Sequence, residues 1–259
     1  MSELVLIERT GPLATLTLNR PEVHNAFNAQ LIADLHAACN VLREAAGLRV
    51  LVLRGAGPSF CAGADLNWMQ ESLNYTHAEN LADAARLDAM LEALNTLPIA
   101  VVGRVHGAAL GGGVGLAACC DVVVAAEQAS FGFTEARLGL LPAVIARYVV
   151  PRIGPGHARA LFMSARRFTA QHALAIGLAH EVTPAEQLDA AVERVVSAVL
   201  SCGPQAVAAS KALVAAVTSL PPAEARDYVI GAIAAARTGP EGQEGLRAFL
   251  EKRRPAWVG

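Results

Sequence analysis

The sequence predicts an α/β fold, and three of its features carry this prediction. Short apolar segments with the character of strands alternate with helical segments over the first half of the chain. These segments are apolar on both faces, which is typical of parallel strands buried between layers of helices. Beyond about Pro184 the pattern changes and contains helices only. We therefore expect an α/β layer followed by a helical region.

The N-terminal part predicts a hairpin and a helix. Residues 4–8 and 13–19 alternate or run apolar on either side of Gly11-Pro12, as in two strands joined by a tight turn. Asn28 has the character of a helix N-cap, and apolar residues then recur at helical spacing up to Gly47.

Three further apolar runs predict buried strands, at residues 50–53, 99–105 and 122–126. A loop rich in glycine and proline follows the first run. A helix over residues 78–97 ends before Pro98, and a glycine stretch after the second run opens another helix.

The last quarter of the chain predicts four helices, over residues 188–200, 205–217, 223–237 and 241–254. Pro204 lies where a first turn tolerates proline, and Pro221-Pro222 separates two of the helices. The last helix begins with glutamates and ends with Lys252-Arg253-Arg254, the charge order that a helix dipole favours. We divide the chain into a core of residues 1–190 and a helical region of residues 191–259, whose Ala-rich helices we expect to be buried on another subunit.

The composition points to a soluble protein inside the cell. The 259 residues suit one large domain, and a net charge of −2 argues against nucleic-acid binding. The five cysteines are odd in number and lack C-x-x-C spacing, as expected of reduced core cysteines. There is no signal-peptide pattern and no uncharged run long enough to span a bilayer, so we expect a cytoplasmic protein without membrane attachment.

Two glycine-containing turns have the character of a site for negative charge. Gly111-Gly112-Gly113 lies between an apolar strand and an Ala-rich helix, and Ala62-Gly63-Ala64-Asp65 follows the preceding strand. Glycine lets backbone pass close to another group, and the first turn of a helix offers unpaired N–H groups. Two such turns on neighbouring strands would aim two amides at one oxygen, which is an oxyanion hole. Alternatively, the glycines only permit close packing of helix on strand.

Glu135 is the acid that the sequence places in reach of the glycine stretch. A glutamate after Phe131-Gly132-Phe133-Thr134 commonly begins a helix and serves its dipole. Apolar surroundings would instead raise the pKa of a buried carboxyl, which suits general acid or base catalysis. Both interpretations stay open on the pattern alone.

A dinucleotide site is the main alternative from another class of enzyme. Residues 113–118 fit G-x-G-x-x-A, and Glu135 follows about 20 residues later, where a ribose-binding acid stands. Residues 107–112 intervene between strand and motif, which weakens the match. No two of the seven histidines are three or four residues apart, so no metal site is expected. His106 and Cys61 are expected to be packed side chains.

Five stretches resemble the enoyl-CoA hydratase/isomerase (crotonase) family, in the family's order and over nearly the whole chain. They are LNRPEVHNA at 18–26, FCAGADL at 60–66, HGAALGGG at 106–113 with Asp121, FGFTEARLG at 131–139 and AFLEKRR at 248–254. The resemblance implies an α/β fold of the crotonase type. It is a spiral of ββα turns with a C-terminal α-helical region that forms trimers, commonly paired as a dimer of trimers.

The resemblance also implies roles for residues. The substrate would be an acyl-CoA thioester, and no cofactor is expected because coenzyme A is part of that substrate. The amides of Ala64 and Gly112 would hold the thioester oxygen, with Glu135 as the acid and base. The residues expected along the coenzyme A cleft are Val23, His24, Ala62, Asp65 and Leu66, with Lys252 at a phosphate.

One position departs from the family's hydratases, which carry two glutamates. Glu135 matches the second, whereas the first falls on Gly115, as in isomerases that keep the second alone. Residues 61–69 and 137–145 look most like bacterial methylglutaconyl-CoA hydratases, so we expect Gly115 to leave space for a substrate with its own carboxylate. We predict hydration of an enoyl-CoA, with double-bond isomerisation by Glu135 as the alternative. A NAD-dependent oxidoreductase and a non-catalytic acyl-CoA-binding protein remain further alternatives.

Overall fold

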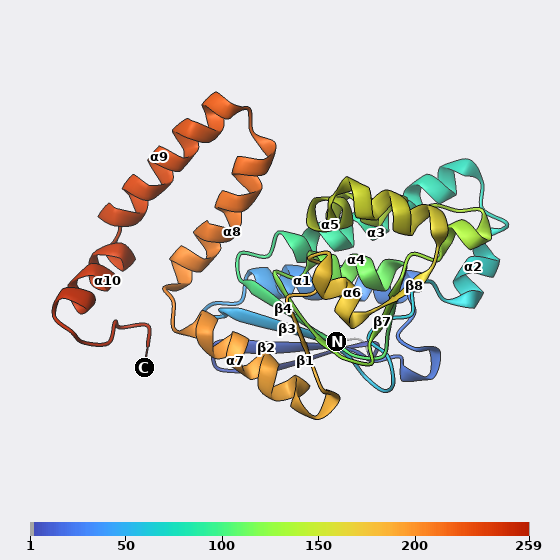
Figure 1. Ribbon diagram of the computed structural model, residues 1–259, viewed down its shortest axis with the longest axis horizontal. Coiled ribbons are helices and arrows are strands. Elements are labelled where there is room, and N and C mark those ends of the chain that lie inside the picture. Colours follow the sequence, from blue (N-terminus) through green and yellow to red (C-terminus); the bar gives the residue numbers. More distant parts are fainter. Residues whose placement is uncertain (1–2, 259) are drawn as a thin grey trace.

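A six-stranded sheet runs through the molecule (Figure 1). The computed structural model describes residues 3–258, and the strand order is β1-β2-β3-β4-β6-β9. The first pair is antiparallel, which confirms the hairpin around Gly11-Pro12, and the other pairs are parallel. The strands are β1 Val5–Thr10, β2 Leu13–Leu18, β3 Val50–Gly55, β4 Ala100–Val105, β6 Val122–Ala126 and β9 Glu181–Thr183.

A second sheet of three short strands, in the order β5-β7-β8, is absent from the sequence prediction. Its strands are β5 Ala108–Leu110, β7 Ser130–Gly132 and β8 Arg167–Thr169. Because β5 follows β4 and β7 follows β6, the chain repeats strand, strand, helix, which is the predicted ββα spiral. An isolated bridge between Cys61 and Ala109 brings the loop after β3 against the same sheet.

Local capping explains where the longer helices begin. The side chain of Asn28 accepts a hydrogen bond from the amide of Leu31 at 2.8 Å, as predicted for the N-cap of α1, Ala29–Arg43. Thr76 and Glu79 form a capping box at the start of α3, His77–Asn95. The remaining helices of the core are α2 Leu66–Ser72, α4 Gly112–Cys119, α5 Ala143–Ser164, α6 Ala170–Ala175 and α7 Leu188–Leu200, with short 3₁₀ turns η1 Pro21–Val23, η2 Glu135–Leu138 and η3 Ala185–Gln187.

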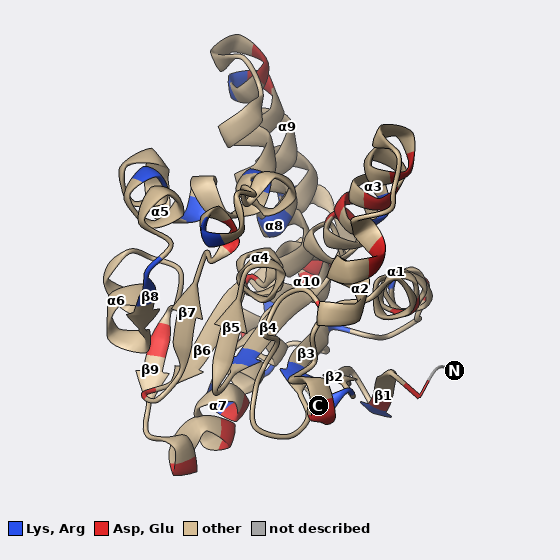
Figure 2. Ribbon diagram, turned by 90° about the vertical axis from the view of Figure 1, so that its right-hand side faces the viewer, with Lys and Arg blue, Asp and Glu red and all other residues tan. Residues whose placement is uncertain are grey.

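Helices cover both faces of the large sheet. One face packs against α1, α3 and α4, and the other packs against α7 (Figure 1). Charged residues gather on the helix surfaces and are sparse on the central strands (Figure 2). Leu188, Val192 and Val196 of α7 are buried on valines of the sheet. The predicted boundary at residue 190 falls inside α7, Leu188–Leu200, which packs on the sheet.

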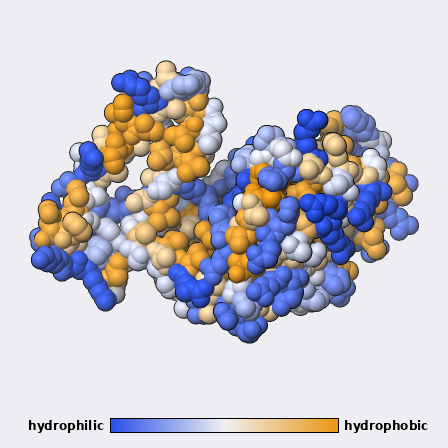
Figure 3. Space-filling view, viewed as in Figure 1, coloured by the Kyte–Doolittle hydropathy of each residue, from blue (hydrophilic) through white to orange (hydrophobic). Residues whose placement is uncertain are grey.

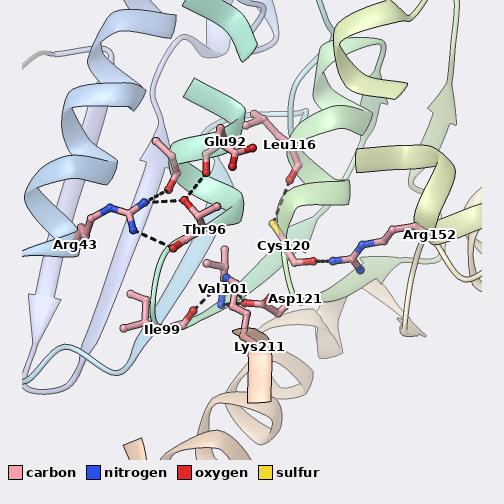
Figure 4. Close-up of polar contacts among 11 residues, drawn as sticks. Arg43, Glu92, Thr96, Ile99, Val101, Leu116, Cys120, Asp121, Arg152 and Lys211 are labelled. Carbon is pink, nitrogen blue, oxygen red and sulfur yellow. Dashed lines mark hydrogen bonds and ion pairs between the residues drawn. The ribbon is translucent and has the colours of Figure 1, made fainter. Parts of the chain in front are cut away.

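A half-buried polar contact joins the core to the first helix beyond it, α8, Pro204–Ser219. Lys211 donates to Oδ2 of Asp121 at 2.9 Å and to the carbonyl of Ile99 at 3.3 Å (Figure 4). The same oxygen of Asp121 accepts the amide of Val101 at 2.8 Å. One of the chain's two lysines thus ties α8 to the start of β4.

The helices beyond the core project from one end of the molecule (Figure 1). They are α8, α9 Pro222–Thr238 and α10 Pro240–Leu250. The last helix ends before the basic run expected to close it, and Arg253 instead pairs with Glu244 at 2.6 Å. Apolar side chains lie exposed along this region (Figure 3), namely Val214, Val217, Ile230, Ile233, Phe249 and Leu250.

No single helix within residues 3–258 has the length and apolar character needed to cross a membrane. The segments Ala185–Leu200 and Pro204–Ser219 meet the length and composition test as a pair, bent by 102° at their junction. The first of these contains α7, whose apolar side is buried on the sheet.

Candidate active site

The loop after β3 is held in place by a buried asparagine that the sequence analysis passes over. Asn25 is fully buried and donates through Nδ2 to the carbonyls of Ala56 and Ser59, at 2.8 and 2.7 Å. Its Oδ1 accepts the amide of Arg20 at 2.8 Å. These bonds fix the turn that precedes the first of the two glycine-containing segments.

The amide of Ala64 is left free by its neighbours' hydrogen bonds. Phe27 donates to the carbonyl of Gly63 at 2.6 Å and accepts the amide of Asp65 at 2.9 Å. In such a parallel bridge the residue between the two bonded ones turns its own N–H away. Among the described residues no acceptor meets the N–H of Ala64, and this residue is exposed.

The side chain of Asp65 has a structural task at the first turn. Its carboxylate accepts the amide of Asn67 at 2.8 Å, as the N-cap of α2, and pairs with Arg20 at 2.7 Å. Burial acts to raise the pKa of Asp65, but the hydrogen bonds and the charge of Arg20 outweigh it and lower the pKa. The carboxylate is therefore already satisfied, and it holds the turn that carries Ala64.

The second turn lies directly against the first. Gly63, at φ 95°, comes so close that a Cβ on it would lie 2.9 Å from the carbonyl oxygen of Leu110. Gly111, at φ 50°, donates to the carbonyl of Gly132 at 2.8 Å and leads into α4. As the first residue of that helix, Gly112 has no intrahelical acceptor for its N–H, and no acceptor in the rest of residues 3–258. Two free amides thus stand on touching turns.

Glu135 reaches the same place from η2. A Cβ added to Gly111 would lie 3.2 Å from Oε1 of Glu135, so the carboxyl rests against that glycine. Its Oε2 is buried and meets no donor within the described chain. Burial raises the pKa of Glu135, with only its own backbone amide opposing. A carboxyl with a raised pKa beside free amides can accept and return a proton.

Gly115 does not offer the space that the sequence analysis expects. It is buried, and a Cβ there would lie 3.0 Å from Cβ of Ile145 and closer still to its Cγ2. The expected role of Gly115 in making room for a substrate carboxylate is therefore wrong. Gly113 is equally enclosed, since a Cβ would lie 3.0 Å from Cβ of Cys61. Neither glycine is open to a pyrophosphate, which removes the basis of the dinucleotide alternative.

The remaining residues expected along the cleft line the edge of the first turn. His24 is exposed, its Nδ1 lies 2.9 Å from Oγ of Ser59, and its carbonyl accepts the amide of Ala62 at 3.0 Å. Val23 precedes it at the end of η1. Leu66 opens α2 with 78% of its side chain exposed. An open, partly apolar edge thus borders the free amide of Ala64.

Lys252 is not brought to this site within one chain. It follows α10, which lies at the opposite end of the molecule from α2 (Figure 1). The tail after it contacts the beginning of β3, where Arg49 donates to the carbonyl of Trp257 at 3.1 Å. The two turns of the site follow the other ends of the strands, so Lys252 lies far from Ala64.

Comparison with known proteins identifies the family of the chain. The sequence model of the enoyl-CoA hydratase/isomerase family matches residues 8–259. The chain belongs to the enoyl-CoA hydratase/isomerase family. It is 33% identical to a crotonyl-CoA hydratase of Syntrophomonas wolfei, over 99% of this chain and 98% of the relative.

Solved structures of this family have the same fold. Pseudomonas aeruginosa AtuE superimposes with a TM-score of 0.96 at 38% identity, covering 99% of this chain and all of that one. An enoyl-CoA hydratase from Shewanella pealeana gives 0.94 at 37% identity, covering 98% and 96%. The crotonase-type fold predicted for the chain is confirmed.

Proposed function

We propose that this enzyme adds water across the α,β double bond of an enoyl-CoA thioester. The amides of Ala64 and Gly112 hold the thioester oxygen, and Glu135 moves the protons. The observation that supports this most directly is the buried Oε2 of Glu135, which has no donor within residues 3–258 and rests beside two free amides.

The two amides act because negative charge gathers on the thioester oxygen when the β-carbon is attacked. Donors already fixed in place stabilise that enolate-like state more than the uncharged thioester. Loss of one such donor typically costs about 3 kcal/mol of transition-state stabilisation. Both donors here are backbone N–H groups, so their direction depends on the turns that hold them.

One carboxyl can complete the reaction in two steps. Ionised Glu135 takes a proton from water as the water oxygen bonds to the β-carbon, and the π electrons move to the α-carbon and thioester. Protonated Glu135 then gives that proton to the α-carbon, which restores the thioester and the ionised carboxyl. The raised pKa of Glu135 brings it closer to the working pH for both transfers.

For the acyl group we propose a short, branched chain that ends in a carboxylate, such as methylglutaconyl. Two donors that lie within a few residues of Ala64 and Glu135 in the chain support this class. Nε1 of Trp68 in α2 is buried without a partner in the described chain, and a carboxylate would supply an acceptor. Arg137 follows Glu135 in η2, is exposed, and makes no ion pair or side-chain hydrogen bond among residues 3–258.

Isomerisation by Glu135 alone is the second candidate, and the apolar Ile145 beside Gly115 favours it. A panel of enoyl-CoA thioesters in heavy water separates the two. Hydration gives a 3-hydroxyacyl product, whereas isomerisation gives a shifted double bond with deuterium on the chain. We expect hydroxylated product and a preference for methylglutaconyl-CoA. Equal turnover of crotonyl-CoA would refute the substrate class, and shifted product alone would refute hydration.

Alternatives outside this chemistry are tested with the same protein. Quenching or enhancement of NADH fluorescence on titration would revive an oxidoreductase. Binding of acyl-CoA without turnover above background would indicate a non-catalytic binding protein.

We also propose that the chain forms a trimer or a dimer of trimers in the cytoplasm. The exposed apolar side chains of α8–α10 support this, since a monomer would leave Phe249 81% exposed. Lys252 would then reach a coenzyme A phosphate only across a subunit boundary. Light scattering behind size-exclusion chromatography that finds a monomer alone would refute the assembly.

A further inference from the structure

One segment of the chain covers the first turn of α4 at two successive points. Glu135 rests against Gly111, and Ile145, ten residues later, rests against Gly115. The two glycines are one helical turn apart, and Gly115 donates to the carbonyl of Gly111 at 3.2 Å. The place beside Gly115 therefore lies one helical turn along α4 from the place of the acid.

Ile145 fills this place and has little freedom to leave it. It lies in the first turn of α5 and is 3% exposed. A β-branched side chain in a helix has one strongly preferred χ1 rotamer, so its methyl groups are fixed once the backbone is fixed. No side chain larger than hydrogen fits at Gly115 while Ile145 is present, because a Cβ would already overlap Cγ2.

The chemical consequence is that the hydrocarbon side chain of Ile145 occupies the space that the carboxyl of a second acid at residue 115 would need. Of the carboxyls on the two turns and η2, that of Asp65 is held by Arg20, and that of Glu135 keeps Oε2 without a donor in the described chain. Adding water needs one group to take a proton and one to give it, and two carboxyls would divide these tasks. With isoleucine in this place, Glu135 must perform both.

We infer that Ile145 determines the course of the reaction by excluding a second ionisable group from the place beside Gly115. This inference rests on the proposed chemistry at Glu135, but its steric part stands alone. It predicts that Gly115 accepts a larger side chain only when Ile145 is made smaller.

The steric part is tested by melting temperature without any substrate. Gly115→Ala should melt several degrees below wild type, since overpacking a core typically costs about 1–3 kcal/mol. When Ile145 is already alanine, adding Gly115→Ala should lower the melting temperature less than the same change does in wild type. A Gly115→Ala protein that melts like wild type, or a double variant that shows only the sum of the two losses, would overturn the inference.

The chemical part compares two double variants that differ in ionisation alone, Gly115→Glu/Ile145→Ala and Gly115→Gln/Ile145→Ala. With trans-2-hexenoyl-CoA, the ratio of 3-hydroxy product to 3-enoyl product should rise about tenfold in the glutamate variant. Gly115→Glu with Ile145 intact should fold poorly or show no such rise. Equal ratios in the two double variants would overturn the inference. Absence of any turnover in wild type would refute the proposed function and leave the melting test to decide the steric claim.

Discussion

Replacing Glu135 by glutamine should stop catalysis and stabilise the protein at the same time. The carboxyl of Glu135 is half-buried, and its Oε2 is buried without a partner in the described chain, an arrangement that costs free energy when the group is ionised. Glutamine keeps the shape and removes the charge, so we expect a gain of about 1 kcal/mol in the free energy of unfolding. For a domain of this size that corresponds to a rise of about 2–4 °C in melting temperature.

The pH dependence of that gain follows from the direction of the shift. The pKa of Glu135 is raised by burial, so the folded protein holds the proton more tightly than the unfolded chain does. The penalty is absent below the unfolded pKa of about 4.3 and grows as pH rises towards the folded value. The melting temperatures of variant and wild type should therefore differ more at pH 7.5 than at pH 5.

Catalysis is measured on the same preparations, with Glu127→Gln as an exposed control. Loss of the acid and base should lower kcat by about 10²–10⁴ while acyl-CoA binding, followed by calorimetry, is retained. The control should match wild type in both melting and turnover. A Glu135→Gln enzyme with more than a tenth of wild-type turnover, or with a lower melting temperature, would refute the reasoning.

Three other changes test the parts that hold the two turns and α8 in place. Arg20→Ala leaves the carboxylate of Asp65 buried and unpaired, which should cost about 3 kcal/mol in urea unfolding at pH 7. Because the pKa of Asp65 is lowered, the stabilisation by its ion pair with Arg20 is present above the unfolded pKa of about 3.9. It is lost as pH falls through the lowered pKa of the folded protein. A loss of stability in Arg20→Ala that stays unchanged into acid would contradict this reasoning. Gly112→Ala places a Cβ 2.5 Å from Cε2 of Phe27, so the turn that carries this amide must shift. We expect kcat/KM in the enoyl-CoA hydration assay to fall at least about tenfold. An unaltered kcat/KM would count against a role of the Gly112 amide. Lys211→Met should speed amide exchange in α8, measured by mass spectrometry, and equal rates would show that the contact holds nothing.

The parts of the fold with strong local signals were predictable from the sequence. A hydrophobic period indicates the hairpin, the buried strands and the helices after residue 188. For α1, the N-cap Asn28 marks the start of the helix. The second sheet escaped because its strands have three residues each, too few for any periodicity. Its existence depends on pairing between segments far apart in the chain, such as Cys61 with Ala109.

The site was predictable where backbone makes it and unpredictable where side chains support it. Three consecutive glycines at residues 111–113 indicate that the backbone passes close to another group, so the turn that carries Gly112 could be predicted from the sequence. The ion pair of Arg20 with Asp65 spans 45 positions, and no local pattern joins them. The contact of Ile145 with Gly115 is equally non-local, which is why an absent side chain was mistaken for open space.

In an oxyanion hole made of peptide amides, the direction of each N–H group depends on the residues that hold the backbone in place. The N–H groups of Ala64 and Gly112 have no rotamers, so their aim is set by how firmly each turn is held. Asn25 and Asp65 hold one turn through buried, satisfied polar contacts, whereas Gly63 and Phe27 hold the other by direct packing. The one buried group left unsatisfied among these is the carboxyl of Glu135, and that is where the proposed reaction needs a group free to bind and release a proton.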